Sequence, residues 1–206
     1  MRLPDGTEHY SGALDADFQR ALIDWIEGLQ ATTPFYRPTM PRSGRPFSVE
    51  MTNAGVLGWV SDKSGYRYQP THPFTGERWA PIPSSVIGIW ERYARFPAPP
   101  EACLVNRYRD TAKLGSHVDA DEAETSAAVV SISLGDDAVF HVGGPKRGDP
   151  KAKITLRSGD IFVLGGASRL AYHGIDRVLA GTSDVVPGGG RINLTLRRVT
   201  RVAEIA

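Results

Sequence analysis

Cysteine is almost absent from this 206-residue chain, which contains only Cys103. A single cysteine excludes an intramolecular disulfide, and its apolar neighbours in the run ACLV indicate a buried, unreactive thiol. Long hydrophobic runs are also missing, since no stretch approaches the roughly 20 apolar residues of a membrane helix and the opening MRLPDGTEHYSG has no signal-like apolar segment. We therefore expect a cytoplasmic protein that works in a reducing compartment and does not bind a membrane.

An excess of charge of one sign is missing too. Lys and Arg total 24 against 23 Asp and Glu, and this net charge of +1 excludes a protein held on nucleic acid by uniform positive charge. Low-complexity tracts and repeats are likewise absent, although 22 Gly and 15 Pro are spread along the chain as turn residues. With 41% hydrophobic residues, the composition is that of a globular protein, and the length predicts a single domain over residues 1–206.

The first hundred residues predict two helices and a set of hairpins. A helix is expected over residues 15–30, because Phe18, Leu22, Trp25, Ile26 and Leu29 recur at helical spacing. A second is expected over 84–95, with Ser84 as its N-cap and a buried face made by Val86, Ile89, Trp90 and Tyr93. Between them, SVEMTNAGVLGWV predicts two short strands about an Asn53-Ala54-Gly55 turn.

After Pro99-Pro100 the pattern changes to short strands. The segments ACLVNRY, AAVVSISLG, AVFHVGG, AKITLRSGD, IFVLGG and RINLTLRRV are rich in β-branched residues and are bounded by Gly, Asp and Pro. Closely spaced antiparallel strands of this kind indicate a sandwich, a barrel or a jelly roll. We therefore predict a mainly β protein with flanking helices, in which a core over about 101–200 shares one hydrophobic interior with helical and hairpin additions over about 1–100.

Three residues suggest a metal site. His117 and Asp119 lie two positions apart in KLGSHVDADE, so their side chains leave the same side of an extended backbone, and His173 follows several strands later. An H-x-D pair alone is more often a surface histidine beside solvated acids. Two imidazoles and one carboxylate, however, are the facial ligand set of non-haem Fe(II) oxygenases, which leaves coordination positions open for oxygen and a co-substrate.

The segment RINLTLRR adds a polar strand face. With a period of two, Arg191, Asn193, Thr195 and Arg197 point to one side, whereas Ile192, Leu194 and Leu196 point to the other. An ordinary outer strand can also look like this. If the polar face is buried, its arginines need an anion, and a guanidinium fork suits a carboxylate.

The order of these elements resembles the AlkB family of Fe(II)/2-oxoglutarate-dependent nucleic-acid dealkylases, in particular its bacterial members. The resemblance covers residues 48–199 and is carried by MTNAGVLGWVSDKSGYRYQP, CLVNRYRDTAKLGSHVDADE, VVSISLGDDAVFHVGGPKRGDP, LRSGDIFVLGGASRLAYHGI and RINLTLR. Residues 1–47 match the pattern poorly. The resemblance implies a double-stranded β-helix, that is, a jelly-roll core, with an N-terminal helix and hairpin lid that recognises the nucleotide.

The family pattern also implies a role for each residue type in the core. Fe(II) would be bound by His117, Asp119 and His173, which would also be the catalytic centre. The co-substrate 2-oxoglutarate would be held by residues from two strands, with Arg191 on its distal carboxylate, Arg197 near the carboxylate that chelates iron, and Asn106, Tyr108 and Asn193 in support. Oxygen would complete the set of reactants.

Substrate residues are implied in the lid and at its rim. Trp59 would stack on the damaged base against the imidazole of His117, Tyr66 and Met51 would line the lid, and Asp121 would bond the exocyclic amine of the base. Arg147 is the favoured phosphate contact within the basic stretch PKRGDPKAKITLR, and the loop with Arg37, Arg42 and Arg45 is a weaker candidate. Taken alone, aromatic residues in a hairpin more often serve as packing, and a basic loop is more often simply solvated.

The sequence thus predicts an oxidative demethylase of 1-methyladenine and 3-methylcytosine. Its partners would be single- or double-stranded alkylated DNA and also RNA, and a monomer is expected. Two alternatives remain open at this point. The same chemistry could act on a modified tRNA base, a protein or a lipid, because the core residues specify the co-substrate and not the prime substrate. A catalytically silent β-sandwich that binds nucleic acid through its basic loops is the third possibility.

Overall fold

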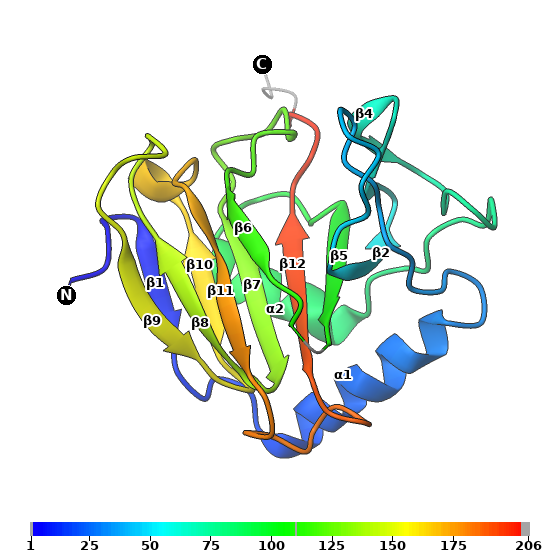
Figure 1. Cartoon of the computed structure of the whole chain (residues 1–206), viewed down its shortest axis with the longest axis horizontal. Coiled ribbons are helices and arrows are strands. Elements are labelled where there is room, and N and C mark those ends of the chain that lie inside the picture. Colours follow the sequence, from blue (N-terminus) through cyan, green and yellow to red (C-terminus); the bar gives the residue numbers. More distant parts are fainter. Residues whose placement is uncertain (1, 110, 203–206) are drawn as a thin grey trace.

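A computed structural model describes residues 2–109 and 111–202, and in it two β-sheets lie as stacked layers (Figure 1). The larger sheet has the strand order β1, β10, β7, β12, β5, β2. Its strands are β1 Thr7–Tyr10, β10 Ile161–Leu164, β7 Val129–Gly135, β12 Arg191–Arg197, β5 Ala102–Tyr108 and β2 Glu50–Gly55. All its pairings are antiparallel, as expected for a jelly roll.

The smaller sheet has the order β6, β11, β8, β9 and is also antiparallel. Its strands are β6 Leu114–His117, β11 His173–Leu179, β8 Asp137–Val142 and β9 Ala152–Leu156. A separate two-stranded hairpin is formed by β3 Gly58–Asp62 and β4 Gly65–Gln69. The mainly β class that the sequence predicts is therefore confirmed.

Two helices cover the outer face of the larger sheet. Helix α1 (Ala16–Leu29) begins after the N-cap Asp15, whose carboxylate accepts a hydrogen bond from the Phe18 amide. Its buried residues are Gln19, Leu22, Ile23, Ile26 and Leu29, so the buried face is rotated from the predicted one and Phe18 and Trp25 lie at its edge. Helix α2 (Ser84–Ala94) buries the four residues that were predicted.

Strand alternation in the larger sheet separates two environments. On β5, Cys103 and Val105 pack with the helices, whereas Leu104 and Tyr108 belong to the second core, between the two sheets. On β12, Ile192, Leu194 and Leu196 pack with the helices, so the polar residues of that strand face the smaller sheet. The expected alternation of RINLTLRR is confirmed, and it directs the arginines into the interior between the sheets.

Two local predictions were wrong, the position of a turn and the N-cap of α2. Asn53 and Ala54 lie within β2, and the chain turns after Gly55, because the Asn53 side chain bonds the backbone of Trp59 in both directions at 3.0 Å and holds β3 beside β2. As a result β2 joins the larger sheet, whereas β3 pairs with β4. Ser84 is the first helical residue rather than the N-cap, a position that Pro83 takes without a side-chain bond.

The N-terminal hundred residues are part of the core sheet as well as its covering. Strand β1 was not foreseen, and it lies beside β10 at one edge of the larger sheet, while β2 forms the other edge (Figure 1). The division into additions over 1–100 and a core over 101–200 is therefore not clean. Among the described residues, no helix combines the length and the apolar character that crossing a bilayer demands.

Candidate active site

Two antiparallel strands bring the histidines together. His117 ends β6 and His173 begins β11, and the two residues are directly paired, with ring centroids 4.5 Å apart. Asp119 follows β6 by two residues, and its carboxylate oxygens lie 3.7 Å from His117 Nε2 and 3.8 Å from His173 Nε2. One ligand atom from each of the three residues lies within 4.8 Å of the other two, which is the spacing a single metal ion can bridge.

Both rings are oriented by backbone carbonyls two residues earlier in the chain. His117 Nδ1 lies 2.9 Å from Gly115 O, and His173 Nδ1 lies 2.9 Å from Ala171 O. A carbonyl oxygen can only accept, so Nδ1 carries the proton in each ring and Nε2 presents its lone pair. This arrangement, a histidine whose other nitrogen is held by a carbonyl, is typical of metal-binding histidines.

The electrostatic environment favours deprotonated ligands. Burial alone would raise the pKa of the Asp119 carboxyl, but Arg197, His173 and His117 outweigh it and hold that pKa below its ordinary value. Burial, reinforced by the neighbouring His117, lowers the pKa of His173 to about 4. At neutral pH the site therefore offers the Asp119 carboxylate and the neutral imidazole of His173, the forms that bind a divalent cation.

The donor set fits Fe(II). Two imidazoles and one carboxylate make the facial triad of non-haem iron oxygenases. Asp119 Oδ2 is buried and has no hydrogen-bond partner among the described residues, which leaves a buried anionic oxygen free to bind a cation.

The triad lines a cavity of about 760 Å³ between the sheets. The same cavity contains every residue that the sequence assigned to the site, from the metal ligands to the lid and the basic rim: Met51, Trp59, Tyr66, Asn106, Tyr108, His117, Asp119, Asp121, Arg147, His173, Arg191, Asn193 and Arg197. Residues from all three sheets thus meet in one space.

Arg191 is the most unusual group in this cavity. Its side chain is completely buried, with Nη2 donating to Ser133 Oγ at 2.7 Å and Nη1 to Asp136 O at 3.3 Å. Its Nε is buried without a hydrogen-bond partner, and no carboxylate forms an ion pair with it within residues 2–109 and 111–202. Burial lowers the pKa of Arg191 to about 10. A buried cation with a free donor is a site for an anionic ligand such as a carboxylate.

Strand β5 places two further polar groups beside Arg191. Tyr108 lies directly opposite Arg191 in the sheet register, and Asn106 lies opposite Asn193. Asn106 is buried, and its Oδ1 lacks a partner among the residues that are described. Asn193 donates to Ser131 Oγ and Ile132 O at 2.7 and 2.9 Å, so it is held within the sheet. These residues fit the co-substrate position that the resemblance implies.

Arg197, at the other end of β12, contacts the metal ligand itself. Its Nη2 lies 2.8 Å from Asp119 Oδ1, and its Nη1 donates to Glu122 Oε1 at 3.1 Å and to the Tyr68 hydroxyl at 3.0 Å. Burial alone would lower the pKa of Arg197, but Asp119, Tyr68 and Glu122 raise it well above its ordinary value. Arg197 therefore stays charged next to the triad.

The residues assigned to the lid all line the cavity and differ in their exposure. Trp59, on β3, is mostly buried, and its ring is stacked on Tyr66 with centroids 5.6 Å apart and planes inclined by 20°. Its Nε1 donates to Asp121 Oδ2 at 2.7 Å. Met51, on β2, is buried, whereas Tyr66 is half exposed. Tyr66 thus covers one face of Trp59, a contact that the sequence did not suggest.

Several basic residues of the stretch 145–157 have polar partners within the protein. Lys153 and Arg157 lie 2.8 and 3.7 Å from Asp176 and Asp137, and Lys151 donates to Ser116 Oγ at 3.1 Å. Arg147 is exposed, lines the cavity mouth and lies over the Tyr172 ring at 6.0 Å. The contact of Arg147 with a phosphate stays a prediction.

Sequence reasoning missed a second layer of buried polar residues. Glu122 and Tyr68 bond Arg197, and Arg169 donates to Asp119 O at 2.8 Å and to Glu122 Oε2 at 3.2 Å. Glu122 stands in the acidic run VDADEAE, which is typical of a solvated segment. The signal that could have found this layer was Arg169, which stands in the segment GGASRLAY. An arginine among small and apolar residues suggests a buried acidic partner.

Known proteins resemble this chain over most of its length. Residues 6–197 match the 2OG-Fe(II) oxygenase superfamily. The chain is 49% identical over 195 residues to an alpha-ketoglutarate-dependent dioxygenase AlkB homolog of Caulobacter vibrioides, covering 94% of this chain and 87% of that protein. It is 42% identical over 181 residues to alpha-ketoglutarate-dependent dioxygenase AlkB of Escherichia coli, covering 86% and 83%. A solved structure of OsALKBH1 superposes with a TM-score of 0.80 at 31% identity, covering 96% of this chain and all of that one.

Proposed function

The chain belongs to the AlkB family of the 2OG-Fe(II) oxygenase superfamily, and from this premise we propose that it is an oxidative demethylase that repairs N-alkylated bases in nucleic acid. The observation that carries the proposal is the shared cavity, in which the His117–Asp119–His173 triad lies with buried Arg191 on one side and the Trp59 lid on the other. The dioxygenase prediction made from the sequence is confirmed by the family. A silent β-sandwich is accordingly not supported.

Fe(II), 2-oxoglutarate and O₂ would supply the oxidation, in which decarboxylation of the co-substrate to succinate is coupled to hydroxylation of the methyl group, followed by release of formaldehyde. In our proposal His117, Asp119 and His173 hold the metal. Arg197 keeps Asp119 oriented and ionised, and it lies near the 2-oxoglutarate carboxylate that would chelate iron. Arg191 binds the distal carboxylate of 2-oxoglutarate, with Asn106, Tyr108 and Asn193 shaping the pocket. The protein thus positions two reactants in one cavity.

The lid would receive the flipped base. Alkylation at adenine N1 or cytosine N3 blocks the Watson–Crick edge, so such a base is less costly to unstack than a paired one. We propose that the base enters between Trp59 and His117, with Tyr66 and Met51 lining the lid, and that stacking there contributes roughly 1–3 kcal/mol. Asp121 lies next to Trp59 and supplies negative charge for a cationic lesion and an acceptor for its exocyclic amine. Arg147, at the mouth, would contact a phosphate.

The finer assignments belong to the same proposal. We take alkylated DNA, single- or double-stranded, as the main substrate and RNA as a second one. The core residues bind 2-oxoglutarate, which is the same co-substrate for either nucleic acid, and the lid residues contact only the base. A monomer in the cytoplasm, organised as one domain over residues 1–206, is consistent with the shared core of the N-terminal and C-terminal parts and with the fully buried thiol of Cys103.

The direct test is turnover of a single-stranded oligonucleotide that carries one 1-methyladenine. With Fe(II) and 2-oxoglutarate we expect formaldehyde and an oligonucleotide lighter by one methylene group, and neither product with the unmethylated strand or with His117→Ala. A protein that consumes 2-oxoglutarate but leaves this strand and its 3-methylcytosine counterpart unchanged would not be a repair demethylase. Parallel assays on a modified tRNA base, a protein and a lipid then identify the substrate, and Trp59→Ala should impair only reactions on a base.

A further inference from the structure

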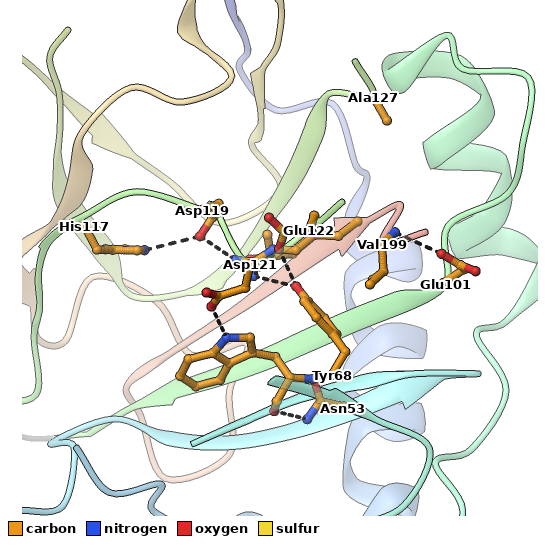
Figure 2. A network of polar contacts seen from close by, with 12 residues as sticks. Asn53, Tyr68, Glu101, His117, Asp119, Asp121, Glu122, Ala127 and Val199 are labelled. Atoms are coloured by element: carbon orange, nitrogen blue, oxygen red, sulfur yellow. Dashed lines mark hydrogen bonds and ion pairs between the residues drawn. The ribbon is translucent and has the colours of Figure 1, made fainter. Parts of the chain in front are cut away.

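The lid hairpin is tied to the metal ligand through a chain of polar groups that runs from half-buried Tyr68 to buried Asp119 (Figure 2). The Tyr68 hydroxyl, on β4, donates to Glu122 Oε1 and accepts from Arg197 Nη1 at 3.0 Å. The same guanidinium lies 2.8 Å from Asp119 Oδ1 through its other terminal nitrogen. A single side chain, Arg197, therefore joins the lid to the carboxylate that we assign to the metal.

The hairpin makes a second connection to the same segment. Trp59 and Tyr68 are directly opposite each other on β3 and β4, so both side chains leave one face of the hairpin. Their acceptors, Asp121 and Glu122, are consecutive residues that follow Asp119 closely. Two neighbouring lid positions thus dock on two neighbouring positions beyond the metal ligand, which fixes the hairpin in translation and in rotation.

The carboxylates and guanidinium groups of this chain are buried and balanced in charge, whereas Tyr68 itself is half-buried. The Glu122 side chain is fully buried, and those of Arg169, Asp119 and Arg197 are 4, 5 and 7% exposed. Two guanidinium groups face two carboxylates, so the cluster is neutral as a whole. In such an environment each hydrogen bond to a charged group is strong, and the loss of one partner leaves a buried group unsatisfied.

We propose that Tyr68 is a positioning residue whose hydroxyl latches the β3–β4 hairpin onto the Glu122–Arg197 pair that orients Asp119, so that metal binding and closure of the lid favour each other. The inference rests on the proposed function, because it takes Asp119 as a metal ligand. A metal held by Asp119 fixes the carboxylate, which fixes Arg197 and presents it to Tyr68. By reciprocity, a latched hairpin favours the ligand geometry that binds the metal.

The latch would act before the methyl group is oxidised, because the lid must open to admit a base. A hairpin held by a few buried bonds opens locally and recloses without global unfolding, and its opening equilibrium is measured by amide exchange. Removing one hydrogen bond to a charged group should shift that equilibrium by about tenfold. The effect should be confined to residues 58–69 and be absent from α2, which packs on the other face of the larger sheet.

Hydrogen exchange with Zn(II) as the only added ligand tests the latch. Zn(II) accepts histidine and carboxylate ligands and has no redox chemistry. In the wild-type protein we expect Zn(II) to slow exchange of the amides in residues 58–69 severalfold. In Tyr68→Phe we expect these amides to exchange about tenfold faster without metal, and the additional slowing by Zn(II) to be lost. Glu122→Gln, which keeps the shape and removes the charge, should behave in the same way.

A matched control is available at Tyr36. Its hydroxyl is buried and has no hydrogen-bond partner among the described residues, so Tyr36→Phe removes the same atom from a tyrosine without breaking a bond. This variant should retain the wild-type exchange pattern and its response to Zn(II). If Tyr68→Phe also responds to Zn(II) like the wild type, the latch is contradicted while the demethylase assignment stands. If Zn(II) does not bind the wild-type protein, both the latch and the metal site fail.

Turnover gives a second readout that a purely structural role would not move. A loosened lid should admit 2-oxoglutarate turnover without a productively placed base, so Tyr68→Phe should raise the ratio of succinate to formaldehyde severalfold on a methylated strand. In the contrary outcome, Tyr68→Phe leaves the ratio of succinate to formaldehyde unchanged while the amides of residues 58–69 exchange faster. That result would show that the hydroxyl stabilises the hairpin without positioning it over the metal, and it would overturn the proposal.

Discussion

The Trp59 indole nitrogen donates a hydrogen bond of 2.7 Å to Asp121 Oδ2, two residues beyond the carboxylate of the candidate metal triad. This bond holds the plane of the indole while Tyr66 covers one of its faces. We therefore expect the Asp121 carboxylate to affect the binding of a base in the cavity in two ways. It orients the aromatic surface, and it attracts positive charge.

Substitutions at Asp121 should separate these two contributions. The change Asp121→Asn retains an oxygen acceptor for the indole but removes the charge, so it should lower kcat/KM about tenfold for cationic 1-methyladenine and much less for neutral 3-methylthymine. Asp121→Ala removes both contributions and should lower kcat/KM for both lesions. Steady-state formaldehyde release on matched single strands measures these ratios.

The comparison needs a check on the metal centre. Turnover of 2-oxoglutarate without nucleic acid should stay close to wild type in Asp121→Asn, because this residue is not among the ligands. An equal loss on the cationic and neutral lesions would contradict a charge effect and leave only the role in orienting Trp59.

Arg191 should be needed for the co-substrate and not for the fold. The side chain is completely buried without an ionic partner in the described part of the chain, so Arg191→Met removes an uncompensated charge. We expect the free energy of unfolding without 2-oxoglutarate to be unchanged or higher by about 1 kcal/mol. The KM for 2-oxoglutarate should rise about 100-fold, since a buried ion pair with its carboxylate is lost.

Thermal unfolding of the Zn(II)-loaded protein checks both halves of this prediction. The wild-type midpoint should rise with added 2-oxoglutarate, as for any ligand that binds only the folded state, whereas that of Arg191→Met should not. Arg191→Lys keeps the charge without the planar fork and should show an intermediate response. A full ligand-induced rise in Arg191→Met would place the distal carboxylate elsewhere.

Much of the site could be predicted from the sequence because its signals are local. The alternation of RINLTLRR directs Arg191 and Arg197 to one face whatever the neighbouring strands are, and the structure places both in the cavity. The His117 and Asp119 spacing likewise specifies a shared direction. Their convergence with His173 depends on strand pairing, which the family resemblance supplied and a period of two could not.

The missed features all depend on contacts distant in sequence. Glu122 is buried by Arg169 and Arg197, which are 47 and 75 residues further along the chain, so nothing in its own acidic segment distinguishes it from a solvated carboxylate. Asn53 looked like a turn residue because asparagine favours turns, but here its side chain bonds the Trp59 backbone and serves within a strand. In both cases a tertiary partner overrode the local preference.

Loss of one triad ligand should abolish metal binding and turnover together. Even residues that only orient metal ligands are worth 10–100-fold in affinity or activity, so His173→Ala should weaken Zn(II) binding by more than about 100-fold and leave no measurable formaldehyde. His9→Gln is a suitable control. His9, on strand β1, pairs with Asp160 and is not among the residues that line the cavity. Calorimetric titration with Zn(II) measures the affinity, and near-wild-type binding in His173→Ala would exclude this histidine as a ligand.

His72 should make stability depend on pH. Its Nδ1 accepts the amide protons of Phe74 and Thr75 at 3.2 and 3.1 Å, and its Nε2 donates to Pro34 O at 3.0 Å. Burial lowers the pKa of His72, so the unfolded chain takes up a proton at a higher pH than the folded one. The bonds of the neutral ring therefore contribute stability above the unfolded pKa of about 6.5, and that contribution is lost as the pH falls below it.

His72→Asn isolates this effect, because an asparagine oxygen can still accept the two amide protons but does not titrate. At about pH 7.5 the variant should be less stable by about 1 kcal/mol, since the bond to Pro34 is lost. On acidification to about pH 5.5 the wild type should lose more stability than the variant, because only the wild type must protonate a buried imidazole. Urea unfolding at both pH values measures the difference, which should narrow or reverse. A gap that stays constant would mean that His72 does not titrate differently in the folded and unfolded states.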